Sequence, residues 1–505
     1  MAIKIIILIL FTAITVAIGF FCSKSTKGLG DFVLGGRKIG PWLTAFSYGT
    51  SYFSAVVFIG YAGQFGWNFG ISALWIGLGN AFIGSLLAWV VLGRRTRVMT
   101  KHLDAATMPD FFAKRFDSNS LKIVTALIIF VFLVPYSASV YKGLGGIFSI
   151  AFGIDYTWCL IGMAVLTGIY VVVGGYLGTA ANSLFQGIVM LIGIVAVLAC
   201  VLGVNGGLAG TLELLSQKTS ETAPNLNGAF VSLFGPDPIS LLSVVILTSL
   251  GTWGLPQMVH KFYTIKNEKS ITTGAVISTV FAVIVAGGSY FLGGLGRLFY
   301  DEEKVIFDNI VPTMLQKTLP DALIGIVLIL LLAASMSTLS SLVLTSSSTV
   351  TLDFLKPLLK KASLFNENKK QVVVIRVLCV LFVLLSLAIA LFPNALITSL
   401  MSLSWGTLAG CFLGPFLYGL YWKRTTRLSV WISILAGVLL NVANLLFPFT
   451  TPTIAGAASM ILSLLIIPAV SLITPKMAAD KTDAIFSCYL KESVTTQRTA
   501  LPEEN

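Results

Sequence analysis

Two short stretches decide how this chain folds: residues 45–54, AFSYGTSYFS, and residues 249–257, SLGTWGLPQ. Each combines glycine with hydroxyl residues in the middle of a long apolar run, and the second also contains Pro256. In a helix interior, glycine costs about 1 kcal/mol and proline about 3 kcal/mol relative to alanine. In lipid, the main-chain groups that such residues release must be buried in protein or line a cavity. We therefore expect two broken membrane helices.

The overall composition is that of a helical membrane protein. Of the 505 residues, 56% are hydrophobic and 11% are charged, and the mean hydropathy is +0.92. A soluble domain carries roughly 25% charged residues, so the composition argues against a soluble enzyme or a secreted disulfide scaffold. Apolar runs of about 20 residues predict transmembrane helices. Thirteen such runs are present, at residues 2–22, 42–65, 71–93, 120–152, 157–176, 183–203, 239–262, 271–297, 322–350, 371–392, 395–420, 428–447 and 453–473.

Basic residues lie mostly in one set of loops, which sets the predicted orientation. Arg94, Lys114 and Lys423 belong to this set, whereas the opposite loops carry acidic residues between 301 and 308. Under the positive-inside rule, the basic loops face the cytoplasm. We expect one transmembrane domain, residues 1–475, in the plasma (inner) membrane, with the N-terminus outside and a polar cytoplasmic tail, residues 476–505. These loops explain the net charge of +12, so we expect no nucleic-acid partner.

No residue pattern indicates catalysis or a bound cofactor. The six cysteines form no CxxC pair, and two histidines cannot build a histidine metal cluster. The sequence also contains no HExxH motif. We therefore expect neither an enzyme nor a cofactor-dependent protein.

The spacing of the two predicted breaks indicates an internal repeat. They fall in the second and seventh runs, five apart, which predicts two five-helix repeats at about residues 42–203 and 239–420. The repeats have inverted orientation because five is odd. Paired broken helices at matching places in inverted repeats are typical of the midplane binding site of secondary transporters. The alternative is that these glycines serve only close helix packing.

The ninth run contains a small polar cluster. Ala334, Ser337 and Thr338 stand at i, i+3 and i+4, so they share one helix face. Two hydroxyls and a main-chain carbonyl can supply oxygen ligands to a small hard cation. Small polar residues that only tighten helix packing are the alternative.

Several motifs together resemble the sodium/solute symporter family, and bacterial sodium/proline-type symporters in particular. They are GGRKIGPW at 35–42, MPDFFAKRF at 108–116, GGYL at 174–177, Gln186, and residues 334–338. The resemblance implies a LeuT-like inverted repeat and sodium as the coupling ion. It also implies five sodium ligands, namely the carbonyls of Thr50, Phe53 and Ala334 and the hydroxyls of Ser337 and Thr338.

Two positions depart from the family pattern. Tyr52 stands where proline symporters have an aspartate, and Ser183 stands where many members have one. That second aspartate supports a further sodium site in some members, so we do not expect that site here.

The resemblance also implies a cargo pocket across the second, fourth and seventh runs. Tyr136 matches a tyrosine on the substrate side of proline symporters. Lys142 is the one basic residue far inside a run. We expect its positive charge to replace a lost cation site or to bind a substrate carboxylate, and snorkelling to the interface is the alternative. The predicted pocket residues are Tyr52, Ser54, Tyr136, Lys142, Thr252, Trp253 and Gln257.

We therefore predict sodium-coupled symport of a small organic solute, an amino acid or a small carboxylate, by alternating access in the lipid bilayer. A proton-coupled or sodium-independent transporter on the same fold, or a non-transporting solute sensor, remains an alternative. The sequence does not predict the oligomeric state.

Overall fold

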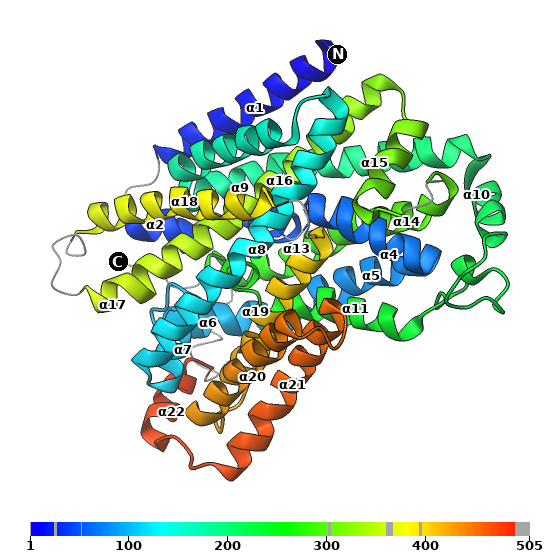
Figure 1. The fold of residues 1–505 in the computed structure, drawn as a ribbon. Helices are drawn as coiled ribbons and strands as arrows, with labels where there is room; N and C mark the ends of the chain where they lie inside the picture. The colour runs from blue at the N-terminus through cyan, green and yellow to red at the C-terminus, as the bar shows by residue number, and fades with distance from the viewer. Residues whose placement is uncertain are drawn as a thin grey trace.

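The chain folds as an all-α polytopic protein (Figure 1). The computed structural model describes residues 2–24, 28–51, 53–300, 305–359, 367–392 and 396–489, and no strand occurs in them. Within these residues, ten helices are long and apolar enough to cross a membrane, or eleven if a bent pair counts as one span. This confirms the predicted fold class, but the count of thirteen spans is not confirmed.

Two glycines redirect the chain within helical stretches, and Gly70 accounts for part of the difference in count. Gly70 has φ +63° and ψ −138°, and Gly175 has φ +55° and ψ −160°, conformations that glycine adopts without steric cost. Helical turns continue directly on both sides of each. Residues Val56–His102, on both sides of Gly70, therefore count as one helical stretch, where the sequence predicted two spans.

The first predicted repeat follows two N-terminal helices, α1 (Ala2–Ser23) and α2 (Leu29–Leu34). A short turn, η1 (Gly35–Arg37), leads into the repeat. The helices from there to the second repeat are α3 (Pro41–Thr50), η2 (Val56–Tyr61), α4 (Ala62–Phe69), η3 (Gly70–Ala73), α5 (Leu74–Gly79), η4 (Asn80–Leu87), η5 (Trp89–Gly93), α6 (Arg94–His102), α7 (Met108–Phe116), α8 (Asn119–Phe152), α9 (Tyr156–Val204), α10 (Gly207–Ser216) and η6 (Ala229–Val231).

The second predicted repeat begins with the bent pair α11 (Pro238–Gly254) and α12 (Pro256–Tyr263). The remaining helices are α13 (Glu268–Ala282), η7 (Val283–Gly287), α14 (Gly288–Gly294), η8 (Gly296–Leu298), α15 (Phe307–Thr318), α16 (Asp321–Thr349), η9 (Val350–Leu355), α17 (Lys356–Leu358), α18 (Asn368–Ala390), α19 (Ile397–Tyr421), α20 (Arg427–Leu446), α21 (Pro452–Ile473), α22 (Ala479–Phe486) and η11 (Ser487–Tyr489).

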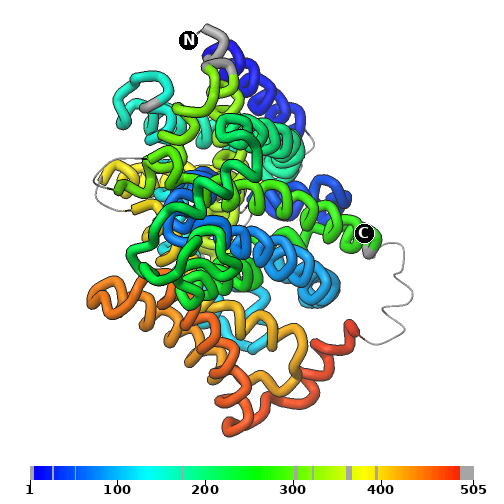
Figure 2. The backbone as a smooth tube through the Cα atoms, turned by 90° about the vertical axis from the view of Figure 1, so that its right-hand side faces the viewer, coloured from blue at the N-terminus to red at the C-terminus, as the bar shows by residue number. Residues whose placement is uncertain are grey.

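Helix α16 lies at the centre of the packing. It contacts α1, α8, α9 and α18, and 83% of the most apolar stretch of its span is buried. By contrast, only 17% of the corresponding stretch of α1 is buried, and α1 runs along one edge of the molecule. Helices α20 and α21 pack on α19 and form the opposite edge (Figure 2). The apolar surface of the outer helices is therefore left for lipid.

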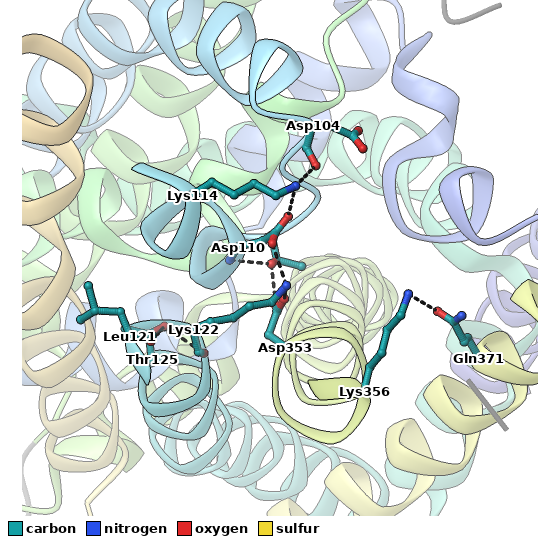
Figure 3. Close-up of polar contacts among 10 residues, drawn as sticks. Asp104, Asp110, Lys114, Leu121, Lys122, Thr125, Asp353, Lys356 and Gln371 are labelled. Carbon is teal, nitrogen blue, oxygen red and sulfur yellow. Dashed lines mark hydrogen bonds and ion pairs between the residues drawn. The ribbon is translucent and has the colours of Figure 1, made fainter. Parts of the chain in front are cut away.

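One end of the bundle, here called the basic side, carries α6, α7 and α22 and the predicted basic loops. A charged cluster fixes three helices there (Figure 3). The Lys122 ammonium lies 2.7 Å from an Asp110 oxygen and 3.2 Å from an Asp353 oxygen, and the Thr107 hydroxyl donates to Asp353 at 2.5 Å. Asp353 is only 1% exposed, so removing one partner would leave an uncompensated buried charge. The cluster thus anchors α7, α8 and η9 to one another.

The first part of the predicted tail docks on this basic side. The Arg95 guanidinium lies between the rings of Tyr421 and Tyr489, at 4.0 and 4.6 Å from their centroids. Lys423 pairs with Asp483 at 2.6 Å. Helix α22 is therefore held against α6, while residues 490–505 lie outside the described residues.

Helices α4 and α14 approach so closely that glycine is required at their contact. A Cβ atom added at Gly66 would lie 2.1 Å from the Gly293 carbonyl carbon, and one added at Gly293 would lie 2.0 Å from the Ala62 oxygen. Overpacking of this kind costs about 1–3 kcal/mol. We expect Gly66→Ala and Gly293→Ala each to lower the thermal unfolding midpoint of the purified protein.

Gly162→Ala is the matched control, because no atom lies within 4 Å of a Cβ added there. It should leave the midpoint unchanged or raise it, since alanine is favoured in helices by about 1 kcal/mol. Equal midpoints for all three variants would contradict the close contact.

Candidate functional site

The second predicted span is broken where the sequence indicates. Helix α3 ends at Thr50, and the next helical residues begin near Ala55. The unwound segment is not exposed to lipid, because Phe53 and Ser54 are at most 2% exposed. The Ser54 hydroxyl accepts a hydrogen bond from the Val56 N–H at 3.2 Å and so caps the second half. Tyr52 lies outside the described residues.

Five oxygen atoms from this break and from α16 converge on one point. The Ser337 hydroxyl donates to the carbonyls of Thr50 and Ala334, both at 2.9 Å. The Thr338 hydroxyl lies 3.3 Å from the Thr50 carbonyl, 3.2 Å from the Phe53 carbonyl and 3.1 Å from the Ala334 carbonyl. All five residues are at most 2% exposed. The structure therefore brings together every residue of the predicted sodium-ligand set.

Ser335 is a further contributor that the sequence analysis missed. Its hydroxyl accepts a hydrogen bond from the Ala55 N–H at 3.0 Å, the first donor after the break. The hydroxyl therefore does for the second half-helix what an N-cap residue does elsewhere. In the sequence, Ser335 could have been noticed because it lies between Ala334 and Ser337. The direction of its side chain, however, depends on how α16 is oriented toward the break.

The seventh predicted span is broken at Leu255, where the main chain is extended and the two halves bend by 44°. Two predicted pocket residues just before this break are bonded to η4. The Thr252 hydroxyl donates to the Gly84 carbonyl at 2.9 Å, and the Trp253 indole N–H donates to the Ile83 carbonyl at 2.9 Å. A carbonyl oxygen can accept a second bond, and Gly84 also accepts from the Tyr48 hydroxyl at 2.7 Å. Thr252 and Trp253 therefore join two helices; their contact with cargo stays a prediction.

Gln257 is the polar group left over at the second break. It is 1% exposed, and neither its amide nitrogen nor its amide oxygen forms a hydrogen bond with the described part of the chain. A buried amide without partners costs about 1–3 kcal/mol. The contact of Gln257 with cargo stays a prediction.

Tyr136 packs against an aromatic residue that the sequence analysis did not select. Its ring meets the ring of Trp405 edge-on, with centroids 5.8 Å apart. A Cβ added at Gly251, just before the second break, would lie 3.1 Å from Trp405. Trp405 therefore lies between α8 and α11. In the sequence, Trp405 stands out as a large aromatic residue among the small residues of α19.

Lys142 is bonded to the main chain. Its ammonium donates to the Phe392 carbonyl at 2.7 Å, just beyond the end of α18, and the residue is 7% exposed. Nearby in α15, burial raises the pKa of Asp308, while a main-chain hydrogen bond and the charge of Lys142 act in the opposite direction. The predicted role of Lys142 toward a substrate carboxylate is not tested by these contacts.

A cavity of about 490 Å³ opens on the side opposite the basic side. Its lining includes Gln64, Arg297, Thr398 and Ser402. The hydroxyl of Ser402, one of the lining residues, is 2.7 Å from the Tyr61 hydroxyl. On the basic side, a cavity between α7, α12 and α16 measures only about 10 Å³. Of these two cavities, the one on the first side is the larger.

Comparison with known proteins identifies the class. The profile of the Sodium:solute symporter family matches residues 32–437. A sodium/proline symporter of Staphylococcus aureus is 33% identical over 446 residues, covering 86% of this chain and 84% of that protein. Sodium/proline symporter 2 of Staphylococcus saprophyticus is 31% identical over 443 residues, with the same shares covered.

Solved structures give the same fold. A sodium-coupled sialic acid symporter in a substrate-bound outward-open state aligns with TM-score 0.74 at 16% identity, covering 94% of this chain and 98% of that one. A nucleobase-cation-symport-1 family transporter in a closed conformation aligns with TM-score 0.54 at 14% identity, covering 90% and 97%. The predicted LeuT-like architecture is thereby confirmed.

The chain belongs to the sodium:solute symporter family. It is an integral membrane protein and a transporter rather than an enzyme, and it carries a small solute in symport with sodium.

The oxygen cluster generates a direct prediction. Replacing Ser337 and Thr338 together by alanine removes two of the five oxygen atoms. We expect the half-saturating sodium concentration for uptake to rise at least about tenfold, which corresponds to about 1.4 kcal/mol.

The matched control lies on the same helix. Ser348 and Thr349 are also a serine followed by a threonine, and both are buried like Ser337 and Thr338. They line the small basic-side cavity and do not belong to the oxygen cluster. Their double alanine variant should keep the wild-type sodium requirement. An unchanged requirement in the Ser337/Thr338 variant would place the ion elsewhere.

Proposed function

We propose that this protein takes up a zwitterionic amino acid or a small carboxylate, and that one sodium ion bound between α3 and α16 drives this uptake. The observation that carries the proposal is the convergence of five buried oxygen atoms at the break of the second span. The ligands would be the carbonyls of Thr50, Phe53 and Ala334 and the hydroxyls of Ser337 and Thr338.

The chemistry of this cluster suits sodium. Hard cations prefer oxygen ligands, and every atom of the cluster is a neutral oxygen. Ser183 stands where many family members have an aspartate. Its hydroxyl donates a hydrogen bond to the Thr179 carbonyl of its own helix at 2.8 Å. This supports a stoichiometry of one sodium ion per cargo molecule.

The cargo site would lie beside the second break. Among the described residues, Gln257 offers a donor and an acceptor that have no partner, and Tyr136 and Trp405 offer aromatic faces, Trp405 beside Gly251. Ser54, Thr252 and Trp253 would shape the site, Tyr52 and Lys142 are further candidates, and the amide of Gln257 would bond the polar end of the cargo. The Staphylococcus relatives are sodium/proline symporters by name, which supports an amino acid as the first class to test.

The orientation follows from the distribution of charge. With the basic side in the cytoplasm, the N-terminus lies outside, the tail lies inside, and the larger cavity opens outward from the plasma membrane. Sodium and cargo would then enter through this cavity, and alternating access would release both on the basic side.

Uptake into proteoliposomes tests the proposal. The purified protein is supplied with a panel of radiolabelled amino acids and small carboxylates, with a sodium gradient, with a proton gradient, or with neither. We expect accumulation of at least one of these solutes with the sodium gradient only. Accumulation driven by protons alone, or no accumulation of any member of the panel, would overturn it.

Gln257→Leu tests the cargo site. Because the amide would bond the cargo directly, we expect the KM for cargo to rise at least about tenfold, or about 1.4 kcal/mol. Gln217→Leu, an exposed glutamine at the end of α10, is the control and should keep the wild-type KM. An unchanged KM in Gln257→Leu would remove this residue from the cargo site.

A further inference from the structure

Lys261 forms a buried junction between three helices. It lies in α12 and is 2% exposed, and its ammonium donates to the Ser341 hydroxyl at 3.0 Å. The Ser341 hydroxyl is in turn 2.8 Å from the hydroxyl of Ser51, at the end of α3. The two inner half-helices, α3 and α12, therefore meet α16 through one set of hydrogen bonds.

The hydrogen bond to Ser341 is the main polar contact of the Lys261 ammonium. The ammonium lies 5.2 Å from the centroid of the Tyr176 ring, a cation–π contact from α9. In the described part of the chain, Lys261 forms no ion pair with a carboxylate. Burying an ammonium costs free energy unless the group is well hydrogen-bonded. Loss of the hydrogen bond from Lys261 to Ser341 would therefore destabilise the protein.

This junction is continuous with the oxygen cluster. Ser51 directly follows Thr50, and the Ser341 hydroxyl also lies 3.1 Å from the carbonyl of Ser337, one turn earlier. An ion that draws Thr50 toward Ser337 and Thr338 therefore sets the distance between Ser51 and Ser341 as well. The ion site and the junction share the same two helices.

The two half-helices are also tied to each other. The Ile39 N–H donates to the Thr264 carbonyl at 3.2 Å, and the Lys266 N–H donates to the Ile39 carbonyl at 3.1 Å. This short parallel bridge joins the segment before α3 to the segment after α12. On the other side of the junction, α16 continues into η9, which the charged cluster at Asp353 holds. The junction thus connects a paired unit, α3 with α12, to an anchored helix.

We propose that Lys261, Ser341 and Ser51 form a latch through which bound sodium keeps the basic side closed. The proposal rests on the proposed function and assigns Lys261 as a positioning residue. Sodium aligns Ser51 with Ser341, and Lys261 extends this alignment from α3 to α12. When sodium leaves, the latch loses its alignment and both half-helices can move away from α16.

A cysteine below the latch reports its state. Thr345 is one turn beyond Ser341, lines the small basic-side cavity together with His260, and is 8% exposed. The full-length Thr345→Cys protein is placed in membrane vesicles with the basic side facing the medium. A membrane-impermeant thiol reagent is added with and without sodium, and the labelling of the chain without this cysteine is subtracted. We expect sodium to slow labelling about tenfold.

Variants of the latch should remove this protection. With Lys261→Met or Ser341→Ala, we expect sodium to slow labelling less than about twofold, whereas Lys261→Arg should keep most of the effect. Lys266→Met is the matched control, because this neighbouring lysine is exposed, and it should behave as the wild type. A lysine that served only packing would lower stability without changing the ratio of labelling rates.

Sodium binding is measured separately, as the sodium-dependent rise in thermal midpoint of each purified variant. Lys261→Met should still show a rise, whereas the Ser337/Thr338 double variant should lose it. If the wild type shows no rise, the proposed function fails. If sodium stabilises Lys261→Met and protects its reporter cysteine as strongly as in the wild type, the latch is overturned.

Discussion

In the hydrocarbon core of a membrane, a main-chain group without a hydrogen-bond partner costs several kcal/mol, and this constraint organises the whole molecule. The break after α3 releases the Thr50 and Phe53 carbonyls and the Ala55 N–H, and hydroxyls of α16 bond all three. Helix α16 must therefore contact the whole broken segment, from Thr50 to Ala55. Its central position, enclosed by α1, α8, α9 and α18, follows from that requirement.

The two breaks are related by the repeat, but the polar groups at each break find their hydrogen-bond partners in different ways. At the first, the hydroxyls of a neighbouring helix bond every released group named above, so the site is ready for an ion that needs only oxygen. At the second, Thr252 and Trp253 bond carbonyls of η4, and the amide of Gln257 forms no hydrogen bond with the described part of the chain. An oxygen-only site and an amide beside aromatic rings suit different ligands. Under the proposed function, sodium would bind at the first break and cargo at the second, within one repeated architecture.

Local composition was enough to predict both breaks, because glycine, proline and hydroxyl residues act within one or two helical turns. The spacing of Ala334, Ser337 and Thr338 likewise placed their oxygen atoms on one face before any tertiary contact was known. The partners of Thr252, Trp253 and Lys142 could not be predicted in this way, because each bonds a main-chain carbonyl far away in the sequence. The span count was missed for a related reason. Gly70 redirects the chain while helical turns continue on both sides, and an apolar run does not reveal this.

The oxygen cluster is also informative about how tightly an ion would be held. The Ser337 and Thr338 hydroxyls lie within hydrogen-bond distance of the three carbonyls, so the cluster can bond its own groups as well as an ion. An entering ion replaces these bonds, each with a net value of about 0.5–1.5 kcal/mol, by contacts from the same oxygen atoms. No carboxylate belongs to the five-oxygen set, so no full negative charge opposes release. A coupling ion must leave in every cycle, and a site that satisfies its own groups when the ion departs makes that departure less costly. The hydroxyls that bond the main-chain groups released at the break would thus also make an ion bound there exchangeable.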